Sequence, residues 1–365
     1  MPEAGRGAMS PGKSGLPLDA PAVLRTIHAR APLRVNDIGG WTDTWFAGRG
    51  RVLNIAVAPA VEVRVRLFEN PRRRKKRVTV RAENFSETFL MDPDAPRRTP
   101  HALLQFTIAS LPVPPDAALE VRLFSPVPAG IATGTSAAVC VALLGALDRL
   151  GGGARAWSEI ARLAHRVETE KLGLQSGIQD QICAAHGGIS FIEMDDYPES
   201  RVRRVRVGRD AWAALGRRLV LVYLGRPHTS SALHEQVIAR LEAGGPQMLV
   251  IRELSRIAVE AKAALEAGDL EAYGEAMVRN NEGQRALHAG LISGGADAIA
   301  SAARRFGAAG WKVNGAGGEG GSMTVLGPPD DAKRQRMVDK INGLGGDIRI
   351  IPVALSSAGL TTWED

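Results

Sequence analysis

The chain has few of the features that mark membrane, secreted or disulfide-bonded proteins. No stretch approaches the roughly 20 consecutive apolar residues that span a bilayer, and the N-terminus has no apolar signal-peptide core. Only two cysteines occur among 365 residues, Cys140 and Cys183. Both lie in apolar segments, which indicates buried reduced thiols and argues against a disulfide framework, a metal site or a nucleophile. We therefore expect a cytoplasmic protein.

Nucleic-acid binding also finds little support, although the formal net charge is +7. The most basic run, residues 72–77 (RRRKKR), contains no interleaved aromatic residues, and no nucleic-acid-binding motif accompanies it. It separates two segments with strand patterns, 61–68 and 78–82, so we interpret it as a solvated hairpin turn. A basic protein can also simply favour anionic substrates such as nucleotides.

Length and patterning indicate two domains of class α+β. Residues 1–25, rich in Pro, Gly and Ala, predict a disordered tail, followed by domains at 26–215 and 216–365. Strands interspersed with helices, without strict βα alternation, argue against a doubly wound parallel sheet. The predicted strands are 52–57, 61–68, 78–82, 119–124, 189–193, 218–224 and 347–353, and the predicted helices 156–172, 233–265, 270–287, 296–306 and 331–342.

A glycine-rich loop, residues 128–138 (PAGIATGTSAA), leads into the apolar segment 139–150. Gly130 and Gly134 would let the backbone turn with its amides exposed, and a following helix would add its own free amides. Thr135 and Ser136 stand where a hydroxyl could cap that helix or bind magnesium. Taken alone, the loop is equally well explained as a structural turn before a core helix.

Two common nucleotide-binding motifs are excluded. A second glycine-rich stretch occurs at 312–322 (KVNGAGGEGGS). Neither stretch shows a strand, a GxGxxG and an acidic residue about 20 positions on, as a Rossmann fingerprint requires. Neither contains the Gly-Lys-Ser/Thr of a Walker A loop.

Three segments in the right order resemble the signature motifs of the GHMP kinases, the superfamily of galactokinase, mevalonate kinase and homoserine kinase. They are residues 31–43 (APLRVNDIGGWTD), 130–138 and 313–322. The resemblance covers the chain after the tail. It implies an ATP- and Mg²⁺-dependent kinase with a ribosomal-protein-S5-domain-2-like N-terminal domain, a ferredoxin-like C-terminal domain and the active site between them.

Within this superfamily, residues 39–44 (GGWTDT) and 52–56 (VLNIA) resemble the fucokinase and D-glycero-D-manno-heptose phosphate kinase branch. Gly40 and Trp41 stand where galactokinases have Glu and His. The resemblance implies transfer of the γ-phosphoryl group of ATP to a hydroxyl, expected to be the anomeric one, of a fucose-like or heptose-like sugar or sugar phosphate.

The resemblance also implies the catalytic residues. Asp180, in the segment 177–181 (GIQDQ), would accept the proton of the attacking hydroxyl, and Arg34 would pair with Asp180 and stabilise the transferring phosphoryl group. Without the resemblance, Arg34 reads as a surface strand residue and Asp180 as a helix N-cap.

Magnesium would be bound by Ser136 and Glu168, since one carboxylate and one hydroxyl suffice beside the ATP phosphates. Glu170 would face elsewhere on the helix, because residues on one face are three or four positions apart. The alternative for either glutamate is an exposed ion pair, which fits Glu170 better. By the same resemblance, ATP would contact Pro128, Gly130, Ile131, Ala132, Thr133, Gly134, Thr135, Ser136 and Ala137.

Sugar recognition would centre on Asp43, whose carboxylate can accept hydrogen bonds from two vicinal hydroxyls. The other implied substrate residues are Trp41, Thr42, Gly177, Gly317, Gly318 and Ser230. Ser230 belongs to the stretch 229–231 (TSS), which is equally well explained as a polar loop before a helix.

Four positions depart from the family pattern: Ala132 replaces a glycine, Thr133 a leucine, Ala137 a residue that is often serine, and Glu319 a glycine. If Glu319 faced the pocket, it would disfavour a phosphorylated sugar. The alternatives are a kinase of a cyclitol or mevalonate-like alcohol and a catalytically silent ligand-binding relative. The expected partners are ATP and a small sugar, without nucleic acid or membrane, and the sequence leaves open whether the chain forms a homodimer.

Overall fold

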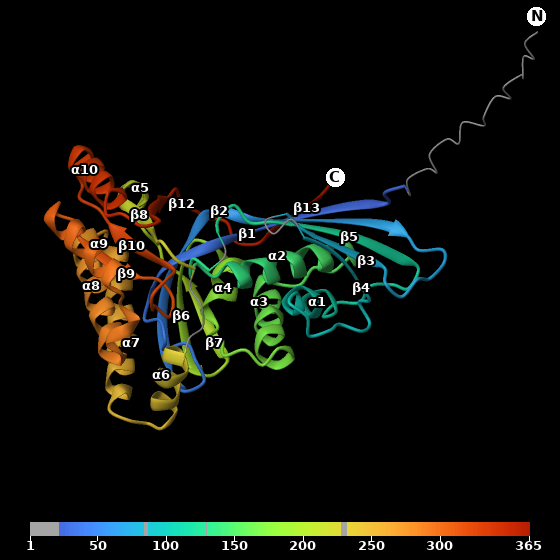
Figure 1. Ribbon diagram of the computed structural model, residues 1–365, viewed down its shortest axis with the longest axis horizontal. Coiled ribbons are helices and arrows are strands. Elements are labelled where there is room, and N and C mark those ends of the chain that lie inside the picture. The colour runs from blue at the N-terminus through green and yellow to red at the C-terminus, as the bar shows by residue number, and fades with distance from the viewer. Residues whose placement is uncertain (1–21, 84–86, 129, 228–231) are drawn as a thin grey trace, which may run out of the picture.

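The computed structural model describes residues 22–83, 87–128, 130–227 and 232–365 (Figure 1). Most of the predicted tail, and Ser230 with its neighbours 228–231, lie outside these residues. The first strand begins at Arg25. No helix within the described residues is long and apolar enough to cross a membrane.

The first sheet has nine strands. Six follow the order β13-β1-β2-β5-β3-β4, while β6, paired in turn with β7, and β12 pair with β2. The 20-residue strand β2 is long enough to pair with β5 along its second half and with β6 along its first. The strands are β1 (Arg25–Ile38), β2 (Gly50–Glu69), β3 (Val78–Ala82), β4 (Glu87–Met91), β5 (Ala117–Phe124), β6 (Ile189–Asp196), β7 (Glu199–Arg204), β12 (Ala354–Leu355) and β13 (Thr361–Glu364).

The basic run 72–77 is not the predicted hairpin turn. Strand β5 lies between β2 and β3 and runs parallel to β3, so the run connects strands that are not neighbours. Residues 72–76 are exposed, but Arg77 is buried. Its guanidinium donates to the Val113 carbonyl at 2.8 Å and pairs with Asp94 at 2.8 Å, so it contributes to the fold.

Helices cover one face of this sheet (Figure 1). The central helix α2 is apolar almost all round and buried, as expected of a core helix. The predicted helix 156–172 is α3 followed by a π-helical turn, η2. The elements of this layer are α1 (Ala102–Ile108), α2 (Thr135–Leu150), α3 (Trp157–Arg166), η2 (Val167–Lys171) and α4 (Gln179–His186).

The second sheet has four antiparallel strands in the order β11-β8-β10-β9. Its core includes Ile299 of α9 and Met337 of α10. The predicted helix 233–265 is two helices, α6 and α7, broken at 244–246 (GGP). The strands are β8 (Leu219–Leu224), β9 (Gly310–Val313), β10 (Ser322–Leu326) and β11 (Ile348–Ile351); the helices are α5 (Arg209–Arg218), α6 (Ala232–Glu242), α7 (Gln247–Ala267), α8 (Leu270–Leu287), the short η3 (Ala289–Leu291), α9 (Gly294–Arg305) and α10 (Asp331–Asn342).

Parts of the predicted second domain, which begins at residue 216, pack with the first sheet. Strands β12 and β13, at the end of the chain, pair with β2 and β1 of the first sheet. Ile257 and Ala261 of α7 and Met277 of α8 belong to the core of the first sheet. Residues 354–364 therefore lie in the first sheet, although the predicted second domain includes them.

Candidate active site

A cleft of about 670 Å³ opens where the two halves meet. Segments distant in sequence line it: strand β1, the loop between β1 and β2, the start of α2, residues 168–180, helix α6 and the loop after β9. Most of the predicted catalytic, metal and sugar residues meet here, namely Arg34, Trp41, Asp43, Ser136, Glu168, Gly177 and Asp180.

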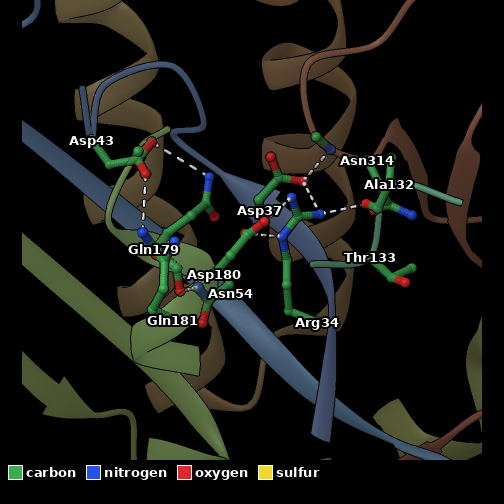
Figure 2. A network of polar contacts seen from close by, with 12 residues as sticks. Arg34, Asp37, Asp43, Asn54, Ala132, Thr133, Gln179, Asp180, Gln181 and Asn314 are labelled. Carbon is green, nitrogen blue, oxygen red and sulfur yellow. Dashed lines mark hydrogen bonds and ion pairs between the residues drawn. The ribbon is translucent and has the colours of Figure 1, made fainter. Parts of the chain in front are cut away.

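Arg34 and Asp180 form an ion pair on the floor of the cleft (Figure 2). Nε of Arg34 donates to Oδ1 of Asp180 at 2.6 Å, and Nη1 donates to the carbonyl of Ala132 at 2.7 Å. Burial by itself would lower the pKa of the Arg34 guanidinium, but the carboxylates of Asp180 and Asp37 raise it. Arg34 is therefore a fixed cation. It is buried, so it is not a surface strand residue, and Asp180 is not the N-cap of α4, because that position is Ile178.

Behind Arg34 lies a buried ion pair that the sequence analysis missed. Nζ of Lys312, on β9, donates to Oδ1 of Asp37 at 2.9 Å, and the Gly315 amide donates to the same oxygen at 3.0 Å. Burial would raise the pKa of Asp37, but Lys312, Arg34 and this amide hold it below its usual range. The lysine in the apolar strand 310–313 (GWKV) is the sequence feature that could have indicated a buried ion pair.

The predicted ATP loop turns as its glycines require. Gly130 and Gly134 have φ of +74° and +67°, in the left-handed region, and Ala132 has φ of +57° without being a glycine. Gly134 is the N-cap of α2, with no side-chain cap, so the suggested capping by Thr135 or Ser136 is wrong. Both hydroxyls fall inside the first helical turn, and the Ser136 side chain lines the cleft.

Other loop residues support the turn. Ile131 and Ala137 are buried, and the Ile131 carbonyl accepts a hydrogen bond from Ser322 at 2.5 Å. The Thr133 carbonyl accepts the backbone amide of Arg34 at 3.0 Å. Pro128 is exposed.

Glu168 projects into the cleft from the π-helical turn. Its Oε2 accepts from Ser176 and from Nε2 of Gln181, both at 2.7 Å, while buried Oε1 has no partner among the described residues. Burial raises the pKa of Glu168 to about 7, although the Ser176 hydrogen bond acts in the other direction. Glu170 is exposed and pairs with Arg166, as the helical spacing predicted.

Asp43 lines the same cleft and is held by the start of α4 (Figure 2). Its Oδ2 accepts the Gln179 amide at 3.1 Å and its Oδ1 accepts Nε2 of Gln179 at 3.4 Å. Burial raises the pKa of Asp43 to about 6, against the lowering effect of the Gln179 amide. A Cβ at Gly177 would lie 2.2 Å from Oδ2 of Asp43, so this glycine permits the approach.

Three predicted substrate residues do not line the cleft. Thr42 is buried, and its hydroxyl bonds the backbone of Arg51. Gly317 and Gly318 are buried too. The Gly317 carbonyl bonds the His234 ring, and the Gly318 amide donates to the Leu291 carbonyl. Glu319 is exposed and does not line the cleft either. The lining positions that the sequence analysis did not predict as site residues are Asp37, Thr44, Trp45, Phe46, Gly173, Leu174, Gln175, Ser176, Gln179, His234, Glu235, Ile238, Gly315 and Ala316.

Both cysteines are free and buried, as predicted. Burial raises the pKa of the Cys140 and Cys183 thiols well above the usual range, which keeps them protonated and unreactive.

Comparison with known proteins identifies the family. Residues 102–188 match the GHMP kinases N terminal domain and residues 261–343 the GHMP kinases C terminal. A mevalonate kinase of Pyrococcus horikoshii is 33% identical over 248 residues, covering 67% of this chain and 69% of the relative. A bifunctional fucokinase/GDP-fucose pyrophosphorylase of Arabidopsis thaliana is 25% identical over 86% of this chain, which spans only 31% of that protein.

Among solved structures, a D-glycero-D-manno-heptose 1-phosphate kinase from Bacteroides thetaiotaomicron superimposes with a TM-score of 0.71 at 21% identity, covering 92% of this chain and 98% of its own. At this identity the likeness shows the fold. The predicted mixed α+β fold with N- and C-terminal GHMP kinase domains is thereby confirmed.

A relative one-third identical over most of its length goes beyond a likeness of fold. Together with the family models, it shows the reaction type that these kinases share, which is the ATP-dependent phosphorylation of an alcohol group on a small molecule. The chain belongs to the GHMP kinase family.

Proposed function

We propose that this protein is a sugar kinase that transfers the γ-phosphoryl group of ATP to a hydroxyl, the anomeric one in our assignment, of a fucose-like or heptose-like sugar. The observation that carries the proposal is the juxtaposition of the Arg34–Asp180 pair with Asp43 in one cleft. The fucokinase relative and the heptose kinase fold neighbour support it.

Asp180 is the proposed base. Its side chain is 26% exposed, so a hydroxyl in the cleft can reach it, while the fixed bond to Arg34 sets its orientation. As the hydroxyl oxygen attacks the γ-phosphorus, its proton passes to the Asp180 carboxylate and the bond to the β-phosphate oxygen breaks, releasing ADP. Arg34 stabilises the negative charge on the transferring group.

The loop 128–137 is the proposed phosphate site. Its left-handed turns at Gly130, Ala132 and Gly134 leave the amides at the start of α2 free of side-chain caps. Free amides and the positive end of a 16-residue helix favour the ATP phosphates.

Ser136 and Glu168 fit a magnesium ion. The Ser136 hydroxyl and the Glu168 carboxylate line the same cleft, and the buried Oε1 of Glu168 lacks a partner among the described residues. Oxygen ligands of this kind suit Mg²⁺, which when bound would neutralise phosphate charge. Deprotonated Glu168 would supply the carboxylate oxygen, with Ser176 and Gln181 fixing its other oxygen.

Asp43 is the proposed sugar ligand. Because Gln179 already fixes its carboxylate, the remaining lone pairs can accept two vicinal hydroxyls. Trp41 borders the same cleft and offers a ring to the apolar face of a sugar.

A mevalonate-like alcohol is the second candidate acceptor, favoured by the 33% identity to a mevalonate kinase. A cytoplasmic location and a homodimeric state are further proposals; sedimentation of the purified protein tests the latter.

The test is Mg²⁺- and ATP-dependent phosphorylation of a panel containing L-fucose, D-mannose, D-galactose, a heptose, myo-inositol and mevalonate. We expect transfer to at least one sugar and its loss in Asp180→Ala. Transfer to mevalonate or the cyclitol alone would replace the sugar assignment by the second candidate, and transfer to none would overturn the proposal.

A further inference from the structure

The acceptor end of the cleft has an apolar wall. Trp41, Trp45 and Phe46 come from the loop between β1 and β2, and Ile238 comes from α6. The rings of Trp41 and Phe46 have centroids 6.4 Å apart, and those of Trp45 and Phe46 5.2 Å apart in an edge contact. The Trp45 indole also donates to Glu242 at 2.7 Å, which ties the loop to α6. Such a wall suits the C–H face of a sugar ring.

The charges that line the cleft are mostly negative. Asp37, Asp43, Glu168, Asp180 and Glu235 contribute carboxyl groups, whereas Arg34 is the single lysine or arginine among the described lining residues. The undescribed residues 228–231 (HTSS) precede α6 and include neither lysine nor arginine.

Among the described residues, the Arg and Lys that line the cleft or pair with its lining carboxylates are already engaged. Arg34 donates to Asp180 and to the Ala132 carbonyl. Lys312 is fully buried and donates to Asp37 and to the Val313 carbonyl. Burial lowers the pKa of His234, whose ring bonds the Gly317 carbonyl, so it is a neutral group at physiological pH.

Buried polar atoms without a hydrogen-bond partner also favour a ligand that carries hydroxyl groups. Apart from Oε1 of Glu168, which we assign to Mg²⁺, the buried acceptors without a partner among the described lining residues are Oδ2 of Asp37 and Oε1 of Gln179, and the corresponding donor is Nε1 of Trp41. A ligand with several hydroxyl donors satisfies such a set, since a hydroxyl both donates and accepts. An ionised phosphate or carboxylate accepts hydrogen bonds without donating any, and its strongest partners are Arg, Lys and free backbone amides.

Within the described part of the cleft, the first turn of α6 is a further place to consider for an anion, since a helix N-terminus attracts negative charge. Glu235 lies in the first turn of α6 and lines the cleft, so its carboxylate already meets this partial charge. A second anion placed there would face Glu235 as a like charge.

We infer that the acceptor is an uncharged sugar, carrying neither phosphate nor carboxylate, and that Glu235 determines this specificity by repelling anionic acceptors. The inference rests on the proposed sugar kinase function and narrows it. It excludes a phosphorylated heptose and a mevalonate-like acid as the preferred acceptor, and assigns to Glu235 the role that the sequence analysis considered for Glu319.

Matched acceptors test this inference: mannose, mannose 6-phosphate and mannuronate, and the same three forms of galactose. At fixed saturating MgATP, we expect kcat/KM to be at least about 100-fold higher for the neutral member of a series. In Glu235→Gln, the ratio of kcat/KM for the neutral acceptor to that for the anionic acceptor should fall about 10-fold, chiefly because KM for the anionic acceptors falls. Glu235→Asp should preserve the ratio. Glu170→Gln, which removes a carboxylate outside the cleft, is the matched control and should leave the ratio unchanged.

The outcomes separate the two proposals. If an anionic member is phosphorylated as well as its neutral counterpart, this inference fails while the sugar kinase function stands. If the ratio in Glu235→Gln equals that of the parent enzyme, the role of Glu235 is wrong. If no sugar is phosphorylated, either in this set or in the panel with L-fucose and a heptose, the proposed function itself fails. Circular dichroism of each variant verifies folding. Because Glu235 is exposed, we expect its substitution to leave the fold unchanged.

Discussion

At the scale of single residues, Asp180 occupies a narrow space. Its carboxylate lies against Arg34, and a Cβ at Gly134 would come within 3.1 Å of its Cγ. The loop that we assign to the phosphates and the proposed base therefore lie close together, so an acceptor hydroxyl at Asp180 would be near the γ-phosphoryl group.

We expect Asp180→Asn to lower kcat about 10²- to 10⁴-fold, because an amide cannot accept the hydroxyl proton. The KM for ATP should change little, since the loop keeps its backbone geometry. Steady-state kinetics measure both values, with Glu170→Gln as the control. Full activity in Asp180→Asn would remove it from the mechanism.

Asp43→Asn should stabilise the fold while impairing sugar binding. Burial raises the pKa of Asp43 to about 6, above the ordinary 3.8. The protonated form is thus favoured in the folded state, and its stabilisation is lost as pH rises from about 4 through 6. Above pH 6 we expect the amide to raise the free energy of unfolding by about 3 kcal/mol, as the pKa difference implies.

Urea denaturation of the parent and Asp43→Asn at pH 4 and pH 8 measures this difference. The variant should gain stability relative to the parent only at the higher pH. An equal effect at both values would show that charge burial is not the cause.

At the scale of elements, the ATP loop carries a local strain. Ala132 holds a left-handed φ of +57°, where a side chain costs about 1 kcal/mol relative to glycine. The carbonyl of this residue accepts from Arg34, so the strained conformation positions the catalytic pair.

Ala132→Gly should therefore raise the free energy of unfolding by up to about 1 kcal/mol. Ala213→Gly, at an exposed position inside α5, should instead lower it by about 1 kcal/mol. Urea midpoints of the two variants test the contrast. Destabilisation by both would mean that Ala132 carries no strain.

The sequence predicted most helices and strands, since hydrophobic periodicity is local. It did not predict the break between α6 and α7, where 244–246 (GGP) interrupts the pattern, because apolar spacing resumes on both sides. It also assumed that the strands on either side of the basic run pair with each other. Strand β5, far along the chain, separates them.

For the site, the motif resemblance brought together Arg34, Asp43, Glu168 and Asp180, which the fold does gather. Glu235 was missed because no motif marks it. Asp37 and Lys312 were missed because they are 275 positions apart, and only the tertiary structure shows that they pair.

At the scale of the whole molecule, the Asp37–Lys312 pair connects β1 of the first sheet to β9 of the second. Both side chains are about 1% exposed. Removing one partner leaves an uncompensated buried charge, which costs more than removing both.

Asp37→Asn and Lys312→Met should each lower the free energy of unfolding by about 3–5 kcal/mol, and the double variant by less than the sum. A double-mutant cycle in urea measures the coupling. Additive losses would mean that the pair does not join the two halves.

The most direct test of the account is the product of the reaction with MgATP and neutral sugars, identified by ³¹P NMR. We predict a new sugar phosphate whose phosphorus couples to the anomeric proton, formed by the parent enzyme and not by Asp180→Asn. ADP formation with no phosphorylated sugar, or a product equally abundant with Asp180→Asn, would contradict it.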